Sequence, residues 1–277
     1  MKDNTKAAIS MLIASLLFAI MMFIARYFCS DLSGFQTLGT RGLLNSIMLL
    51  PFLRKRHFTQ SKRYYKELLI RGTLGSIGAC LIFQAILLIP LANAASLTRS
   101  ASLFVPFIAA IFIAEKLKLS RVFYAILGFT GALLIIKPSF EKVELGGIMA
   151  LASAAFNAGA FVTIRHVSKK VDTQLTMFWF LSLSAFYTFV FFGHTFKPLT
   201  ETQFFYLFII SIFGFFGQYF MTTAYALAPA TIVAPWQNSE VIFTAILGMT
   251  FLQQYPDLIS VCGMILVAIA AVKVTTT

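Results

Sequence analysis

The sequence is poor in charged residues, and above all in acidic ones. Only 12% of its 277 residues are charged, and 22 Lys and Arg residues stand against 10 Asp and Glu. Soluble domains carry about 25% charged residues. Together with a hydrophobic content of 59% and a mean hydropathy of +0.85, this scarcity excludes an ordinary soluble domain. It indicates a protein that crosses a membrane many times.

Catalytic and cofactor-binding motifs are also missing. The sequence contains no Walker motif, Gly-rich dinucleotide fingerprint, His-Glu-x-x-His or Gly-x-Ser-x-Gly. Its three cysteines, Cys29, Cys80 and Cys262, are an odd number and lack metal-ligand spacing, which supports neither a zinc site nor a disulfide framework. An integral-membrane enzyme would need a catalytic constellation at the membrane surface, and we identify none. We therefore expect no enzyme activity, no cofactor and no metal.

The apolar residues are arranged in blocks of about 17 to 23, each long enough to cross roughly 30 Å of hydrocarbon as a helix. The expected spans are about 7–25, 35–53, 68–89, 92–114, 120–136, 146–164, 174–192, 203–226, 231–252 and 257–273. We therefore predict an all-α integral membrane protein with ten transmembrane helices.

The second half of the chain repeats the first at a constant offset of 139 residues. The matched positions include Arg26/Arg165, Gly75/Gly214, Gly78/Gly217, Ala85/Ala224 and Pro90/Pro229. Each copy contains five spans, and an odd number makes the second copy enter the bilayer from the opposite side. The sequence thus predicts two inverted five-helix repeats, residues 1–138 and 139–277, which is an architecture of secondary transporters.

Basic residues are concentrated on one side of this ten-span arrangement. Four lie on the other side: Arg26, Lys137, Lys142 and Lys197. The sixteen on the basic side are Lys2, Lys6, Arg54, Lys55, Arg56, Lys62, Arg63, Lys66, Arg71, Lys116, Lys118, Arg121, Arg165, Lys169, Lys170 and Lys273. By the positive-inside rule we expect both termini in the cytoplasm. The net charge of +12 then reflects topology and contact with lipid headgroups, and we expect no nucleic-acid partner.

Two charges lie deep inside predicted spans. Arg99 is roughly 11 Å from the outer end of the fourth span, and Glu240 is roughly 14 Å from the cytoplasmic end of the ninth. A charge at the bilayer centre costs about 2.5–3.5 kcal/mol on an insertion scale, so such residues pair or face water. Two interpretations remain open: Arg99 and Glu240 lock the halves together, or at least one of them contacts substrate. Glu240 is the only carboxylate placed deep within a span, which makes it the candidate for proton coupling.

Other polar or aromatic side chains in the spans are candidates to line a cavity. Gln84 and Tyr225 lie on polar faces of the third and eighth spans, Trp236 follows Pro235 in the ninth, and Asn157 is surrounded by small residues in the sixth. Each has an alternative role in helix packing. Arg41 lies on a face with Thr37 and Asn45, for which we favour a structural role, and kinks are expected at Pro106 and Pro235.

A family resemblance covers both halves of the chain. Its motifs are Leu-Phe-Val-Pro at 103–106, Ala-Glu at 114–115, Gly-Phe-Thr-Gly at 128–131 and Ser-Glu-Val at 239–241. This pattern resembles the EamA-like branch of the drug/metabolite transporter superfamily, although Gln254 replaces the Glu expected opposite Glu115. The resemblance implies alternating access around a cavity lined mainly by spans 3, 4, 8 and 9, with help from 1 and 6. Glu115, at a helix end near Lys116 and Lys118, is expected to pair with nearby cations.

The sequence thus predicts a secondary transporter for a small polar metabolite in the bacterial inner membrane. An amino acid or amino-acid derivative is favoured because a zwitterion needs one site of each sign, and Arg99 and Glu240 provide both. S-adenosylmethionine, choline or a purine is the alternative, with Trp236 and Tyr225 as aromatic faces. A passive channel would require a continuous polar track, which the isolated buried charges do not form. Direction, coupling ion and oligomeric state are left open.

Overall fold

The computed structural model describes residues 2–29, 31–88, 97–116, 118–136, 145–252 and 257–276. These residues form helices and connecting turns, without a strand among them. The long helices are α1 (Lys2–Phe28), α2 (Gly34–Leu49), α4 (Tyr65–Leu88), α6 (Ala101–Ile113), α7 (Leu119–Ile136), α8 (Leu145–Val167), α9 (Thr173–Phe192), α10 (Glu201–Leu227), α12 (Ser239–Leu252) and α13 (Leu258–Thr276). Shorter elements are η1 (Leu50–Phe52), α3 (Lys55–Arg63), η2 (Gly193–Thr195), α11 (Ala230–Val233) and η3 (Ala234–Asn238).

The helices follow the predicted spans closely, with three differences among the described residues. In the fourth span, a turn at Ser100 separates the helical residues 97–99 from α6. The ninth span is not one helix, because the 3-10 element η3 separates α11 from α12. The basic loop after the second span contains a helix of its own, α3, which the apolar pattern did not indicate. Pro90, Lys137, Lys142 and Gln254 lie outside the described residues, as do the adjoining ends of the third and fourth spans.

Within the described residues, five helices are long and apolar enough to cross a membrane by length and composition: Asp3–Ala25, Tyr65–Ala85, Leu145–Val167, Thr173–Thr195 and Glu201–Leu227. Three shorter apolar helices there occupy Leu97–Ile113, Leu119–Ile135 and Leu258–Val274. Large apolar side chains on these helices and on α12 face outward, among them Ile111, Phe112, Phe251 and Leu258, each more than two-thirds exposed. An exterior of this kind is suited to lipid rather than water.

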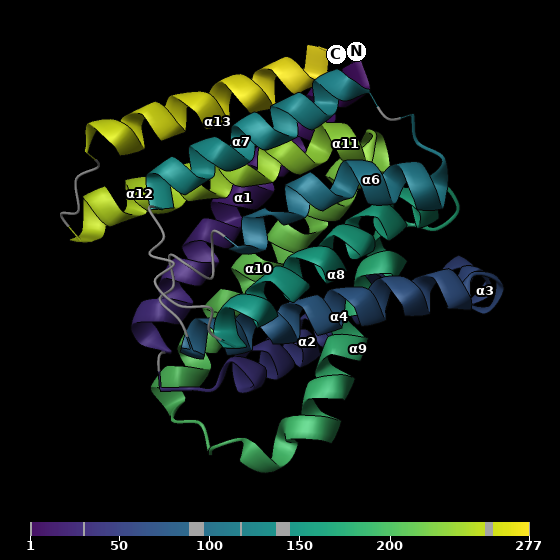
Figure 1. The fold of residues 1–277 in the computed structure, drawn as a ribbon. Helices are drawn as coiled ribbons and strands as arrows, with labels where there is room; N and C mark the ends of the chain where they lie inside the picture. Colours follow the sequence, from purple (N-terminus) through teal and green to yellow (C-terminus); the bar gives the residue numbers. More distant parts are fainter. Residues whose placement is uncertain are drawn as a thin grey trace.

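The most extensive helix contacts join the two halves of the sequence. In Figure 1, α7 lies beside α13 along one edge of the bundle, and α1 packs on α10, α4 on α8 and α2 on α9. The first residue of α1 and the last of α13 lie at the same end of the bundle (Figure 1). The core is therefore built from paired helices that are distant in sequence.

Glycines allow these paired helices to approach closely. A Cβ atom on Gly131 of α7 would lie 2.7 Å from the backbone oxygen of Gly263 in α13, and a Cβ on Gly42 of α2 would lie 2.8 Å from the backbone oxygen of Leu181 in α9. Neither helix pair leaves space for a side chain at these points. Small residues of this kind are typical of helix contacts inside membranes, where van der Waals packing is the main attraction.

Candidate functional site

A cavity of about 210 Å³ lies in the middle of the bundle. Its walls come from α1, α4, the segment 97–101, α8, α10, η3 and the start of α12, which correspond to the spans expected to line it. Arg41 of α2 and Phe180 of α9 add to the lining. The volume is below the ~300–1,000 Å³ that drug-sized ligands occupy, so the cavity is suited to a small metabolite.

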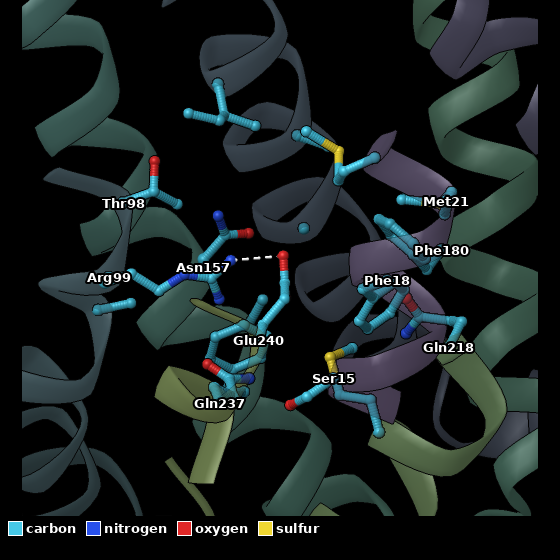
Figure 2. Close-up of a pocket in the computed structure, with 18 of the residues that line it drawn as sticks. Ser15, Phe18, Met21, Thr98, Arg99, Asn157, Phe180, Gln218, Gln237 and Glu240 are labelled. Atoms are coloured by element: carbon cyan, nitrogen blue, oxygen red, sulfur yellow. Dashed lines mark ion pairs between the residues drawn. The ribbon is translucent and has the colours of Figure 1, made fainter. Parts of the chain in front are cut away.

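An ion pair between Arg99 and Glu240 joins two walls of this cavity. Nη2 of Arg99 lies 2.6 Å from Oε1 of Glu240, and the side chains are 18% and 14% exposed. Figure 2 shows the pair, with Asn157 beside Arg99 and with Phe18, Phe180 and Gln218 across the cavity from it. Because one partner precedes α6 and the other begins α12, the pair connects the two halves of the chain.

Breaks in both helices bring these charges together. Residues 97–99 are helical, the chain turns at Ser100, and α6 begins at Ala101. On the other side, η3 ends at Asn238, so that Glu240 lies in the first turn of α12. A carboxylate in the first turn of a helix is stabilised by the helix dipole. The pair therefore lies where both polypeptide segments change direction.

The two predicted proline kinks have different outcomes. Pro235 lies inside η3, where the ninth segment departs from α-helical geometry, as its missing N–H leads one to expect. In contrast, α6 continues from Ala101 to Ile113 through Pro106. The interruption on that side occurs at Ser100, six residues earlier, and directly follows Arg99.

Asn157 contributes both to the cavity and to helix packing. It lines the cavity, but its Nδ2 also donates to Oγ of Ser153 at 3.1 Å. Ser153 in turn donates to the backbone oxygen of Gly78 at 2.7 Å. These contacts join α8 to α4, so Asn157 has a structural partner and a free side facing the cavity.

The other three candidates do not line the cavity. Gln84 is half-buried in α4 beyond the lining residues Ile82 and Phe83. Tyr225 is fully buried and stacks on Phe161, whose ring does line the cavity, with centroids 5.1 Å apart. Trp236 packs in the core cluster around α1 and α10 and is 9% exposed. The aromatic residues that line the cavity are Phe18, Phe83, Phe161 and Phe180.

Two further arginines face the cavity. Arg71 was counted above among the cytoplasmic cations because it lies near one end of its span, but the structure buries it in the cavity wall. Arg41, which we assigned a structural role, lines the same cavity. In the sequence, the matched pair Gly75/Gly214 could have pointed to Arg71 as a residue of the cavity wall, because Gly75 lies against the Arg71 guanidinium. In the described ranges no group of three or more His, Cys, Asp and Glu residues could hold a metal ion.

Comparison with known proteins identifies relatives over nearly the whole chain. The profile of the EamA-like transporter family matches residues 5–137 and, separately, residues 144–276. The pseudopaline exporter CntI of Pseudomonas aeruginosa is 28% identical over 267 residues, covering 96% of this chain and 94% of the relative. The S-adenosylmethionine uptake transporter of Rickettsia bellii is 23% identical over 249 residues, covering 88% of this chain and 84% of the relative.

A human relative and a solved structure extend the comparison. Human solute carrier family 35 member G1 is 27% identical over 251 residues, covering 84% of this chain and 69% of the relative. One solved crystal structure superposes with a TM-score of 0.78 at 15% identity, covering all of this chain and 98% of the other. At that identity the match concerns the fold alone. The matched families and named relatives are transporters rather than enzymes.

Proposed function

Because the chain belongs to the EamA-like transporter family, we propose that it is a secondary transporter for an amino acid or an amino-acid derivative. The observation that carries this proposal is the Arg99–Glu240 ion pair in the cavity wall. A zwitterion presents one carboxylate and one ammonium group. Arg99 binds the carboxylate, for which its planar guanidinium is well suited, and Glu240 binds the ammonium.

The pair also offers a way to link binding with conformational change. Nε of Arg99 is buried and has no hydrogen-bond partner among the described residues. A substrate carboxylate can occupy that side of the guanidinium and then replace Glu240 as its counter-charge. Since a ligand shifts a conformational equilibrium only through its different affinity for the two states, exchange of partners at Arg99 supplies the required difference. We infer that Glu240, released from Arg99, takes up the coupling proton.

The proposed architecture is ten transmembrane helices in two inverted repeats, residues 1–138 and 139–277. The double family match supports it, because the profile fits each half once. Packing at matched glycines supports it too. A Cβ on Gly78 would meet Asn157 at 2.6 Å, and a Cβ on Gly217 would meet Phe18 at 2.9 Å. Gly78 and Gly217 are 139 residues apart, and so are Phe18 and Asn157. The contact between α4 and α8 is therefore the counterpart of the contact between α10 and α1.

Alternating access in a bacterial inner membrane, with both termini in the cytoplasm, completes the proposal. The distribution of Lys and Arg supports this orientation. The bundle also brings both ends of the described chain to one side (Figure 1). Rocking of the two repeats around a fixed central site is the motion that inverted-repeat transporters use.

A cationic or purine-containing metabolite is the second candidate. The relative from Rickettsia bellii is named for S-adenosylmethionine uptake, and four phenylalanines, Phe18, Phe83, Phe161 and Phe180, line the cavity. In this case Glu240 would hold the positive group and an aromatic face would hold the cation or base.

A metabolite panel tests the proposal directly. The purified full chain is heated with amino acids, amino-acid derivatives, choline, S-adenosylmethionine and nucleosides, because a ligand that binds only the folded state raises the unfolding temperature. Stabilisation by an amino compound that has a free carboxylate and no fixed cation is expected, and the same compound should enter liposomes that contain the protein. Stabilisation by the fixed cations choline or S-adenosylmethionine, and by no other compound of the panel, would instead support the second candidate.

A further inference from the structure

Arg41 and Arg71 are two buried cations that the Arg99–Glu240 pair leaves without a counter-charge. They line the cavity and are 7% and 2% exposed. Nε of Arg41 and both Nε and Nη1 of Arg71 have no hydrogen-bond partner in the part of the chain that the structure describes. Nor does either form an ion pair with any described carboxylate. A buried charge without a partner lowers the stability of the folded protein. A bound ligand that supplies the opposite charge can offset this loss of stability.

Each guanidinium lies against a glycine, that of Arg41 against one on the neighbouring helix α10 and that of Arg71 against one a turn further along its own helix α4. A Cβ atom on Gly214 of α10 would lie 2.5 Å from Nε of Arg41, and a Cβ on Gly75 of α4 would collide with Nη1 of Arg71. Gly75 and Gly214 occupy the same position in the two halves of the chain. Both halves thus omit a side chain at the point where an arginine head group enters the cavity wall.

Both arginines come from segments that pack on α9. The ring of Phe180 lies against Arg71, with its centroid 4.6 Å from Cζ, which is a cation–π contact. Gly42, the residue after Arg41, packs against the backbone of Leu181, the residue after Phe180. Arg41 and Arg71 thus belong to helix segments that contact the same turn of α9, and both line the cavity.

The charges that the described residues bring to the cavity do not balance for a simple zwitterion. Among those residues, Arg41, Arg71, Arg99 and Glu240 are the charged lining residues and give a formal charge of +2. A zwitterion adds no net charge and leaves this excess in place. A ligand with additional acidic groups would neutralise it, and guanidinium groups bind carboxylates and phosphates through paired hydrogen bonds.

We propose that Arg41 and Arg71 form a second anion-binding subsite, and that the transported amino compound carries at least two acidic groups and a net negative charge. This inference rests on the proposed function, in which Arg99 and Glu240 hold the amino-acid end of the ligand. The second acidic group, a carboxylate or a phosphate, lies between Arg41 and Arg71. The ring of Phe180 packs against the Arg71 guanidinium of this subsite.

Matched pairs of acid and amide test the subsite. The purified full chain is titrated with glutamate against glutamine, with aspartate against asparagine, and with O-phosphoserine against serine, and the thermal unfolding temperature is recorded for each. The acid of at least one pair should bind more tightly than its neutral partner by roughly 10-fold to 150-fold, the range expected for hydrogen bonds to a charged group. The pair with the larger preference identifies carboxylate or phosphate.

Variants of the two arginines show which side chains cause the preference for the acid over its neutral partner. Arg41→Gln and Arg71→Gln should bring the acid-to-amide ratio close to one, because binding of the acid weakens more than binding of its neutral partner. The matched control is Arg63→Gln, which removes one positive charge from the exposed surface of α3 and should keep the ratio of the parent. If a Gln variant does not fold, the ratio is measured on Arg41→Lys and Arg71→Lys, which keep the charge but lose the paired hydrogen bonds, and it should fall there as well.

Each result bears on a different proposal. Equal binding of acid and neutral partner by the parent would overturn the second anion subsite and leave the amino-acid assignment intact. Absence of stabilisation by every amino compound in the panel would overturn both. An acid preference that persists in all four arginine variants would place the acidic group elsewhere and overturn the assignment to Arg41 and Arg71.

Discussion

The carboxylate of Glu115 caps the helix that begins beside Thr231. Oε1 of Glu115 accepts hydrogen bonds from the backbone N–H of Thr231 at 3.3 Å and from its hydroxyl group, and Oε2 accepts from the N–H of Ala230 at 3.2 Å. Arg121 donates to the Thr231 hydroxyl at 2.9 Å. The pairing of Glu115 with a nearby cation, expected from the sequence, is present as well, since Nη1 of Arg121 lies 3.8 Å from Oε1 of Glu115. In addition, Glu115 joins the end of α6 to the start of α11, in the other half of the chain.

We predict that Glu115→Ala lowers the thermal unfolding temperature by several degrees. The N-terminal N–H groups of α11 would lose their acceptor, and hydrogen bonds to a charged group contribute about 1.5–3 kcal/mol. Differential scanning fluorimetry of the purified protein measures the change. Glu201→Ala, in the exposed first turn of α10, is the control and should unfold close to the parent temperature. Equal unfolding temperatures for both variants would show that this cap contributes nothing to stability.

Arg99 and Glu240 should each be required for transport. Arg99→Ala and Glu240→Ala are each expected to abolish uptake into liposomes, with insertion retained and some stability lost, because each leaves its partner unpaired in a buried position. The double variant Arg99→Ala/Glu240→Ala should remain inactive. Recovery of full transport in the double variant would mean that the pair is only a structural lock.

Proton coupling should depend on the Glu240 carboxylate. Glu240→Gln keeps the shape of the side chain but cannot bind or release a proton, so it should still exchange substrate across the membrane. It should fail to concentrate that substrate when a pH gradient is imposed. Liposome uptake with and without the gradient separates the two activities. Accumulation equal to that of the parent would exclude Glu240 as the coupling residue.

Contact between α7 and α13 should tolerate no added methyl group. Gly131→Ala would place Cβ 2.7 Å from the Gly263 backbone oxygen and 2.9 Å from Cγ2 of Val267, and overpacking of this kind costs about 1–3 kcal/mol. A lower thermal unfolding temperature is expected. The matched control Gly193→Ala has nothing within 4 Å of the new Cβ and should unfold like the parent. A stable Gly131→Ala variant would mean that the two helices separate easily.

Topology is open to a direct measurement. Reporter fusions at Thr277 and within residues 54–66 should both report the cytoplasm, since sixteen of the basic residues were assigned to that side. A periplasmic signal at either position would contradict the proposed ten-span arrangement.

Helix positions followed from the sequence because runs of apolar residues reflect the thickness of the bilayer. The same reasoning brought Arg99 and Glu240 to one depth, and the structure pairs them. What the pattern could not show is the direction of each side chain. Arg71 looked like a residue at the membrane surface because its α carbon lies near a helix end, yet its long side chain enters the cavity wall.

Two aromatic residues show the same limit. Tyr225, on a polar face of the eighth span, and Trp236, next to Pro235, were candidates for the cavity lining, with helix packing as the alternative. The structure puts both behind the lining, with Tyr225 stacked on Phe161. Rotation of a helix by a quarter turn decides whether a side chain faces a cavity or its neighbour, and periodicity alone does not fix that angle when a helix is apolar on most faces.

Pairing between distant helices has a consequence for biosynthesis. α1, which is synthesised first, packs against α10, whose last residue is Leu227. At roughly 5–20 residues per second, a ribosome needs on the order of 10 to 40 s to complete that partner. During this interval the small-residue faces of the early helices remain in lipid without their final neighbours. The early helices therefore have to persist as separate helices until the last third of the protein has been made.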